Sequence, residues 1–390
     1  MQIPTATPFF LIREELLSQN ITDFRKALDE LWPNSIIAYS VKTNSLPWIL
    51  KWMNGHGVYA EVVSDEEYEH AILSGYSEQN IVFNGPIKGT EQVRRALKHG
   101  SIVNIDSRRE EVLIEKERPY NNGQLGIRVN IDPTIFMEKD VGYQEDGFRF
   151  GYSDDNGELL RVIKTLEKVY ENRRIGLHVH VNSITRSLRV YRMIAQYTSK
   201  IIEKYKLDPP YVDIGGGFFG GVPGKTTPRE YIQTIQEEFE KAIDISKVKL
   251  IIEPGSAAIG SAVELHTSVV DVKDTKFARI VTTDGSRIHI DPVWLKKSYT
   301  YSTNAKKPSI NKQVICGYTC MDHDRMMVLE NEPELSIGDR IVYQRVGNYT
   351  VTLGGAFIKP LPPVYAMVNG EIEVARKKMS IEEYYKMETA

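Results

Sequence analysis

The sequence has few cysteines, no long apolar run and almost no net charge. No apolar run approaches the ~20 residues that span a bilayer, and the N-terminal residues lack the basic and apolar regions of a secretory signal. A formal net charge of −3 provides no basic face for nucleic acid. Cys316 and Cys320 are the two cysteines; they exclude a disulfide framework, make a poor zinc site and are typical of a reducing compartment. We therefore expect a cytoplasmic protein without a metal, a membrane anchor or a nucleic-acid partner.

Short apolar runs alternate with amphipathic segments up to Gly255. Two segments carry helix signals: Ser64 precedes one that closes at Gly75, and another ends at Gly100. This alternation predicts a parallel sheet, and the number of strands favours an α/β fold of the (β/α)8 TIM-barrel type over a doubly wound open sheet. The strands are expected at 36–42, 58–63, 81–84, 101–106, 124–130, 175–181, 211–217 and 249–255.

After Gly255 the pattern changes to strands with turn signals and little helix. It predicts an antiparallel β-sandwich or barrel-like C-terminal domain. The apolar stretch 7–17 needs a place to be buried, so we expect it to pair with this domain. The chain then divides into a barrel at 28–264 and a β domain of 1–27 and 265–390. The later strands are expected at 266–274, 279–285, 313–320, 339–353 and 363–377.

Polar residues or glycines follow each of the eight early strands. The C-terminal ends of barrel strands converge on one mouth, where the active sites of this fold lie. Lysine is among the residue types least often buried, so one at the end of an apolar strand needs a partner or a function. A single cofactor would account for all of these residues. They are Lys42, Glu61, Asn84, Asp106, Arg128, Asn130, His178, His180, Ser183, Gly215, Gly216, Gly217, Glu253 and Gly255.

The glycine run "DIGGGFFG" indicates a phosphate site. Consecutive glycines let the backbone approach a ligand and direct amides at it, and phosphate sites of barrels lie after strands seven and eight. Taken alone, the run also fits a flexible turn. A phosphate-bearing cofactor beside Lys42 suggests pyridoxal phosphate held as a Schiff base. Glu253 would pair with its pyridine nitrogen and His180 would stack on its ring, while only one of His178 and His180 is expected to reach the mouth.

Taken together, these segments resemble the fold-type III pyridoxal-phosphate decarboxylases. This family includes diaminopimelate, ornithine and arginine decarboxylases and shares its barrel with alanine racemase. The resemblance is carried by "AYSVKTN", "EVVSDEE", "GLHVHVNS", "DIGGGF", "EPG", "CGYTCMDHD" and "GNYTVT", which occur in the family's order.

The resemblance implies a role for each matching residue. Lys42 is the Schiff-base residue and His180 the stacking residue, while Cys320 reaches the active site of the partner subunit in a homodimer. After CO2 leaves the substrate, Cys320 protonates the α-carbon, so the chain is expected to be a carboxy-lyase. The remaining cofactor contacts implied are Glu61, Ser183, Gly215, Gly216, Gly217, Glu253, Gly255 and Tyr349.

The departures from the family pattern concern the substrate. Ser256 stands where many members carry an arginine, and Met321 follows Cys320 where relatives place an acid for the substrate's distal amino group. A thioether cannot neutralise an ammonium in a closed site. We therefore expect a modified, conjugated or carrier-bound amino acid whose distal group is neutral or acidic. The candidate substrate residues are Arg287, His289, Lys296, Met321 and Asp324.

Two alternatives to a decarboxylase remain on the same fold. A racemase favours an arginine at the pyridine nitrogen and a tyrosine as second base, and Glu253 and Cys320 argue against it. An inactive, decarboxylase-like binding protein would have lost cofactor residues, whereas Lys42, His180 and Tyr349 are all present.

Overall fold

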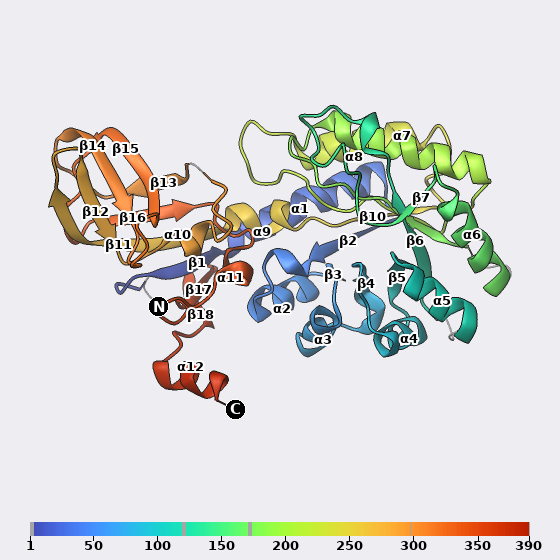
Figure 1. Cartoon of the computed structure of the whole chain (residues 1–390), viewed down its shortest axis with the longest axis horizontal. Coiled ribbons are helices and arrows are strands. Elements are labelled where there is room, and N and C mark those ends of the chain that lie inside the picture. Colours follow the sequence, from blue (N-terminus) through green and yellow to red (C-terminus); the bar gives the residue numbers. More distant parts are fainter. Residues whose placement is uncertain (1–3, 119–121, 171–173, 297, 390) are drawn as a thin grey trace. The chain divides into compact units, whose positions relative to one another are not determined.

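The computed structural model describes residues 4–118, 122–170, 174–296 and 298–389, in two compact units. The barrel unit comprises Asn20–Lys42 and Ile49–Ala257, and the β unit comprises Met1–Gln19, Thr43–Trp48 and Ala258–Ala390. Helices flank the strands of the barrel unit, as Figure 1 shows. None of the helices in these ranges is both long and apolar enough to cross a membrane.

Eight parallel strands close into a barrel. They pair in the order β2, β3, β4, β5, β6, β8, β9 and β10, and β10 pairs again with β2. The predicted TIM barrel is confirmed and the open sheet is excluded. The strands are β2 (Ser35–Ser40), β3 (Tyr59–Val62), β4 (Ile81–Phe83), β5 (Ile102–Ile105), β6 (Gln124–Asn130), β8 (Gly176–His178), β9 (Tyr211–Asp213) and β10 (Lys249–Ile252), with β7 (Tyr152–Ser153) added beside β6.

The helix signals in the sequence correspond to real helix ends. Ser64 caps its helix, since its hydroxyl accepts a hydrogen bond from the Glu67 backbone N–H at 3.2 Å. Gly100 ends the next helix with φ +100°, a left-handed conformation that glycine adopts without strain. The longer helices are α1 (Glu14–Leu31), α2 (Pro47–Gly55), α3 (Asp65–Leu73), α4 (Thr90–His99), α5 (Arg108–Glu117), α6 (Glu158–Val169), α7 (Leu188–Tyr205), α8 (Pro228–Phe239) and α12 (Ile381–Glu388). The short ones are α9 (Ser256–Ile259), α10 (Arg287–Ile290), α11 (Thr350–Leu353), η1 (Val41–Thr43), η2 (Glu78–Asn80), η3 (Pro133–Ile135) and η4 (Gly260–Ala262).

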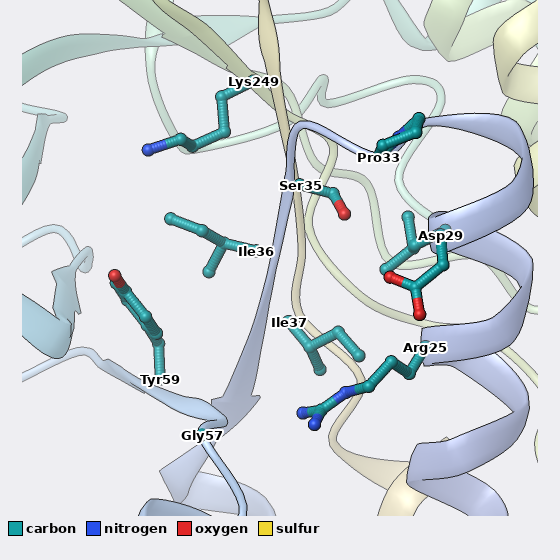
Figure 2. A pocket seen from close by; sticks show the side chains of 10 residues that line it. Arg25, Asp29, Pro33, Ser35, Ile36, Ile37, Gly57, Tyr59 and Lys249 are labelled. Carbon is teal, nitrogen blue, oxygen red and sulfur yellow. The ribbon is translucent and has the colours of Figure 1, made fainter.

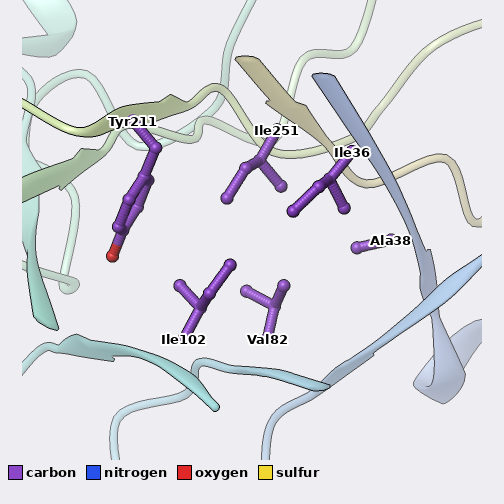
Figure 3. Close-up of a cluster of buried hydrophobic side chains, with 6 residues drawn as sticks. All are labelled: Ile36, Ala38, Val82, Ile102, Tyr211 and Ile251. Atoms are coloured by element: carbon purple, nitrogen blue, oxygen red, sulfur yellow. The ribbon is translucent and has the colours of Figure 1, made fainter. Parts of the chain in front are cut away.

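A cluster of buried apolar side chains, which includes the Tyr211 ring, fills part of the barrel interior (Figure 3). A Cβ on Gly126 would lie 2.2 Å from the Tyr211 hydroxyl oxygen, and one on Gly176 would lie 2.1 Å from its Cζ. These two glycines therefore leave the space that the tyrosine ring occupies across the barrel. The interior cluster consists of Ile36, Ala38, Val82, Ile102, Tyr211 and Ile251.

The β unit contains the predicted N-terminal strand. Strand β1 (Phe9–Arg13) pairs antiparallel with β11 (Val263–Asp274) and parallel with β17 (Val364–Val368). The pair of β12 (Arg279–Thr283) with β14 (Ser309–Cys316) is also parallel. The predicted β domain is confirmed, and most of its strand pairs are antiparallel, but the sheet is mixed because strands far apart in sequence are not held to hairpin geometry. The other strands are β13 (Thr300–Thr303), β15 (Arg325–Pro333), β16 (Arg340–Gln344) and β18 (Glu371–Arg376).

The strand predictions in the β unit also fail in detail, and the segment 363–377 contains two strands, β17 and β18. The segment 339–353 is not one strand, because β16 ends at Gln344 and the backbone turns left-handed at Arg345 and Tyr349 before α11. Strands β13 and β15 were not predicted. Strand β15 lies at the end of its sheet, and its buried residues Met326, Met327 and Leu329 do not alternate regularly with exposed ones, so the pattern typical of a strand is broken.

Candidate active site

Lys42 lies in the turn η1, directly after β2, and faces a buried carboxylate. Its Nζ donates to Ser40 Oγ and to Glu61 Oε2, both at 2.6 Å. The Glu61 side chain is 1% exposed, whereas that of Lys42 is 39% exposed. Burial raises the pKa of Glu61, but the Lys42 charge and the hydrogen bonds from Lys42, Ser40 and Asn84 outweigh it and lower the pKa. The lysine is thus held at a carboxylate while it stays open to solvent.

Asn84, which follows β4, joins Glu61 to a second carboxyl group. Its Nδ2 donates to Glu61 Oε1 at 3.2 Å and to Glu253 Oε1 at 2.6 Å. Burial, followed by the negative charges of Asp213 and Glu61, raises the pKa of Glu253 well above its usual range. Burial also raises the pKa of Asp213 to about 7. In the protein alone, the surroundings of Glu253 therefore favour its protonated form.

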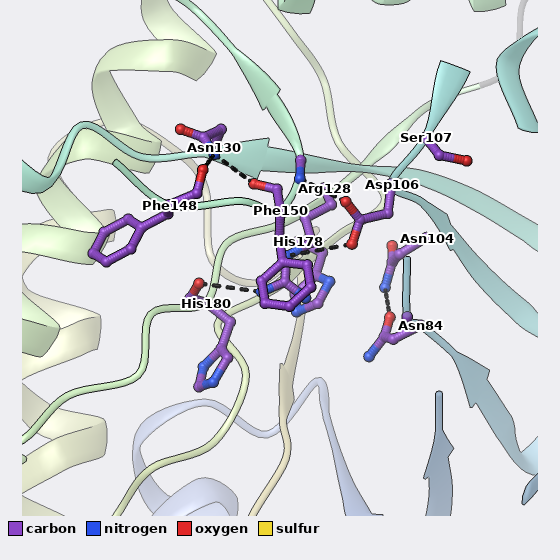
Figure 4. A network of polar contacts seen from close by, with 12 residues as sticks. Asn84, Asn104, Asp106, Ser107, Arg128, Asn130, Phe148, Phe150, His178 and His180 are labelled. Atoms are coloured by element: carbon purple, nitrogen blue, oxygen red, sulfur yellow. Dashed lines mark hydrogen bonds and ion pairs between the residues drawn. The ribbon is translucent and has the colours of Figure 1, made fainter. Parts of the chain in front are cut away.

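His178, the last residue of β8, is 1% exposed, and His180, two residues later, is half-buried at the same end of the barrel (Figure 4). The Nε2 of His178 lies 3.9 Å from Glu253 Oε1. The expectation that only one of His178 and His180 reaches the mouth is wrong, because β8 ends at His178 and His180 lies in the loop that follows, beside Gly215. Burial, followed by the charge of Arg128, lowers the pKa of His180 to about 3 and that of His178 well below its usual range, so both rings are neutral.

The glycine loop after β9 is tightly packed, which excludes a flexible turn. A Cβ on Gly215 would lie 2.3 Å from His180 Nδ1, and one on Gly216 would lie 2.2 Å from the Glu253 carbonyl oxygen. Gly215 and Gly217 have φ +67° and +86°. The N–H groups of Gly216 and Gly217 make no hydrogen bond with any residue that the structure describes. The loop therefore presents backbone donors that suit an anion.

The Ser183 hydroxyl bonds to its own loop and to the segment that follows η3. The Oγ accepts from the Arg186 backbone N–H at 2.8 Å and donates to the Asp140 carbonyl at 3.4 Å. Gly255 immediately follows the Glu253-Pro254 pair after β10. The barrel unit thus brings together Lys42, Glu61, His180, Gly215, Gly216, Gly217 and Glu253, and places Ser183 and Gly255 in loops that follow β8 and β10.

The other predicted site residues lie in the β unit. Tyr349 has a left-handed backbone and donates its N–H to the Thr43 carbonyl at 2.8 Å. Cys320 is exposed and Met321 is partly exposed. Asp324 is 2% exposed and accepts from Ser286 Oγ at 2.9 Å.

Three predicted substrate residues are occupied by contacts within the β unit. Besides Ser286, Asp324 accepts from the Arg287 N–H at 2.9 Å and from Thr319 Oγ1 at 2.6 Å. The Arg287 guanidinium is paired with Asp291 at 2.9 Å. His289 is 4% exposed, and burial lowers its pKa to about 4. Asp324 and Arg287 thus already have partners within the β unit, and the His289 ring packs against Phe10 and Tyr318.

Two cavities of about 300 and 680 Å³ lie at the opposite, N-terminal end of the barrel strands. Both are lined by Ile36, Tyr59 and Lys249 (Figure 2). Along β10, Lys249, Ile251 and Glu253 are two residues apart, so the apolar cluster separates these cavities from the polar layer.

Comparison with known proteins agrees with this geometry. Residues 15–260 match the family described as "Pyridoxal-dependent decarboxylase, pyridoxal binding domain". The chain belongs to this family. Its membership confirms the predicted family, the carboxy-lyase class and pyridoxal phosphate as cofactor. The site also fits this cofactor, because it combines a lysine amine, free loop amides and a buried carboxyl group.

Relatives within the family span nearly the whole chain. A diaminopimelate decarboxylase of Archaeoglobus fulgidus is 25% identical over 96% of this chain and 91% of its own length, and one of Aquifex aeolicus is 24% identical over 95% and 89%. The fold resembles the crystal structure of Helicobacter pylori diaminopimelate decarboxylase complexed with L-lysine, with a TM-score of 0.83, 24% identity and coverage of 98% and 97%. It also resembles the Paramecium bursaria Chlorella virus arginine decarboxylase, with a TM-score of 0.78, 21% identity and coverage of 93% and 96%.

Sequence reasoning gave no role to Asn104, Tyr211 and Asp213. The first two are hydrogen-bonded, with the Tyr211 hydroxyl donating to Asn104 Oδ1 at 2.6 Å. The sequence does contain a signal for two of these residues, since Asn104 lies inside an otherwise apolar strand and Asp213 at the end of one. Their partners lie on other strands, which no local pattern indicates.

Proposed function

We propose that this enzyme decarboxylates a modified or conjugated α-amino acid to CO2 and an amine. The observation that carries the catalytic part is the buried chain of contacts from Lys42 through Glu61 and Asn84 to Glu253. When bound, pyridoxal phosphate accepts the electron pair that the departing carboxylate leaves on the α-carbon. The barrel at 28–264 would bind this cofactor.

Each residue of the proposed site has one task. Lys42 holds the cofactor through its amine and Glu253 pairs with the ring nitrogen. Neutral His180 supports the ring face, and its pKa of about 3 keeps a positive charge away from that face. The cofactor phosphate would lie at the glycine loop, at Gly255, and near Ser183 and Tyr349.

Cys320 is proposed to deliver a proton to the α-carbon after CO2 leaves. Its thiol is exposed and is not in a disulfide. We propose that it serves the barrel of a second copy in a homodimer, so that each active site uses two chains. The low cysteine content supports a cytoplasmic enzyme.

The proposed substrate follows from the segment after Cys320. Met321 is not an acid, and the Asp324 carboxylate already accepts hydrogen bonds from Ser286, Arg287 and Thr319. Asp322 is the one remaining acid between Cys320 and Arg325, and it is exposed. A free distal ammonium therefore has no buried carboxylate of this segment to pair with.

Among the described residues of the neighbouring segment, Arg287 and Lys296 are the cations that could meet a distal acidic group. Arg287 is neutralised by Asp291, whereas Lys296 donates only a long hydrogen bond of 3.4 Å to a backbone carbonyl. Burial lowers the pKa of Lys296, so a carboxylate partner would stabilise its charge. We propose Lys296 and Met321 as the residues that meet the distal group.

Diaminopimelate itself is the alternative substrate, because the relatives named above carry that activity in their names. The test is a panel of free lysine, ornithine, arginine and diaminopimelate beside their distally N-acylated and carrier-tethered forms. CO2 release is measured for each. We expect the acylated or tethered forms to give the highest kcat/KM. Free diaminopimelate giving the highest value would overturn the substrate proposal and leave the decarboxylase intact.

A further inference from the structure

We propose that Asn84 is a positioning residue that directs a proton from Glu253 to the ring nitrogen of the cofactor. This inference rests on the proposed function. Asn84 does so by donating hydrogen bonds to Glu61 and Glu253 at the same time, which stabilises both groups as carboxylates. It acts through Glu253 and does not touch the reacting atoms of the substrate.

The geometry uses the full donor capacity of the amide. A primary amide has two N–H donors on one nitrogen. Nδ2 of Asn84 lies 3.2 Å from Glu61 Oε1 and 2.6 Å from Glu253 Oε1. Both donors therefore point at carboxyl oxygens, one beside Lys42 and one at the proposed ring-nitrogen partner.

A second asparagine fixes the direction of this amide, as Figure 4 shows for the pair. Asn84 Oδ1 accepts from Asn104 Nδ2 at 2.9 Å, and that nitrogen also faces Asp213 Oδ2 at 3.4 Å. Asn104 Oδ1 in turn accepts from the Tyr211 hydroxyl at 2.6 Å. Turning Asn84 over would place its oxygen against two carboxyl groups and its nitrogen against a donor. The chain of bonds from Tyr211 therefore allows one orientation only.

Burial makes these bonds decisive. Glu61, Asn84, Asn104 and Tyr211 are each at most 2% exposed and Glu253 is 5% exposed. Water therefore cannot replace a missing donor at low cost. The charged and titratable groups around Glu253 are Glu61 on β3, Asp213 on β9, His178 on β8, Arg128 on β6 and Lys42.

The consequence concerns where one proton resides. Asp213 and Glu61 are negative neighbours that favour a protonated Glu253. A hydrogen bond to the charged form of a carboxyl group acts in the opposite direction and favours ionisation. A protonated ring nitrogen withdraws electrons from the α-carbon best, so the donor from Asn84 supports the electron-accepting state of the ring.

The experiment reconstitutes the protein with pyridoxal phosphate labelled with ¹⁵N in its ring. It measures the ring-nitrogen chemical shift, which reports protonation, across neutral pH in the wild type, Asn84→Asp and Asn84→Leu. Asn122→Asp is the matched control. Asn122 is an exposed asparagine just before β6, and its Nδ2 donates to the Lys98 carbonyl. We expect a protonated nitrogen in the wild type and the control, and a largely unprotonated one in both Asn84 variants. Cofactor affinity should fall about tenfold to a hundredfold in Asn84→Leu, as for a lost bond to a charged group.

A more distant variant separates positioning from local damage. Tyr211→Phe leaves Asn84 in place but removes the donor that ends the chain, and it should move the ring-nitrogen shift part of the way toward that of Asn84→Leu. A ring nitrogen equally protonated in the wild type, Asn84→Asp and Asn84→Leu would overturn the inference. The ring-nitrogen measurement does not depend on the substrate. A protein that racemises amino acids, or does not react with any of them, would therefore overturn the proposed function without changing the ring-nitrogen result.

Discussion

The two units of this chain treat their predicted site residues in opposite ways. In the barrel unit, side chains from β3 and β10 and from the turns after β2 and β4 meet within hydrogen-bond distance. In the β unit, Asp324 and Arg287 are bound by other residues of the same unit, and His289 packs against Phe10 and Tyr318. Parallel strands bring their ends together by topology, whereas a loop positions residues only through its own contacts. The barrel therefore brings its predicted site residues together through its topology, whereas the β unit positions its own through local contacts.

Replacing Lys42 should produce the largest effect on the barrel side of this comparison. Lys42→Ala removes the amine that would hold the cofactor, so we expect no measurable decarboxylation. Borohydride reduction of the reconstituted wild type, followed by peptide mapping, should place the cofactor on the peptide that contains Lys42. Lys51→Ala, an exposed lysine on α2, serves as the control and should behave as the wild type. An adduct on any other lysine would contradict the assignment.

Removing the ionisable group of Glu253 should have the next largest effect on decarboxylation. Glu253→Gln keeps the shape but cannot hold a charge against the ring nitrogen, so kcat should fall on the order of 10²–10³-fold, as for other preorganised electrostatic groups. Steady-state kinetics check this, with Glu203→Gln on the exposed face of α7 as the control. A kcat within twofold of the wild type would show that Glu253 is not the ring partner.

Cys320 tests whether the β unit contributes to catalysis at all. Cys320→Ala should lower kcat about 10²-fold, as for loss of a general acid, while the cofactor spectrum stays unchanged. Mixing Cys320→Ala with Lys42→Ala subunits should restore about a quarter of the wild-type sites if a C2 dimer shares its active sites. No recovery after subunit exchange, checked by mass, would argue that Cys320 acts within its own chain.

The barrel could be predicted further than the β unit, for physical reasons. Lys42 and Glu253 are found from sequence because each follows an apolar run, and Glu61 because it is a charged residue inside one. Parallel strands end at one mouth, so these residues are expected together without knowledge of how far each strand is shifted along its neighbour. Asn104 and Tyr211 pair across the barrel, and that pairing depends on the space left by Gly126 and Gly176.

In the β unit the substrate candidates stay predictions, because chemical type alone does not indicate which contacts a side chain already makes. An arginine and an aspartate in a predicted substrate segment suggest ligand binding, but Arg287 and Asp324 are used by Asp291 and Ser286. Strand pairing in the β unit could not be predicted from local patterns either, since the parallel pairs of β1 with β17 and β12 with β14 join distant segments.

Replacing Asp324 tests whether this residue stabilises the β unit or binds substrate. Asp324→Asn removes the charge that accepts from Ser286, Arg287 and Thr319, and we expect it to lower the free energy of unfolding by about 2–3 kcal/mol. Asp322→Asn, an exposed neighbour, should leave that free energy unchanged. Denaturant unfolding measures both. A stable Asp324→Asn protein with a raised KM would instead make Asp324 a substrate residue.

Replacing Glu67 should have the smallest effect, which concerns how the stability of the barrel unit depends on pH. Its carboxylate accepts from the Val63 N–H at 2.9 Å, yet burial, and the negative charge of Glu61, raise its pKa from 4.5 to about 7. The folded state therefore binds more protons than the unfolded state between these values, and stability falls as pH rises through this window.

The full shift corresponds to about 3 kcal/mol, and partial exposure of the side chain reduces the expected loss to about 2 kcal/mol. Unfolding by urea at a series of pH values should show this slope in the wild type. Glu67→Gln should flatten it, because an amide does not titrate, whereas Glu66→Gln on the exposed side of α3 should keep it. An unchanged slope in Glu67→Gln would place the pH dependence in the Glu253 and Asp213 pair instead, since burial raises the pKa of both of these groups as well.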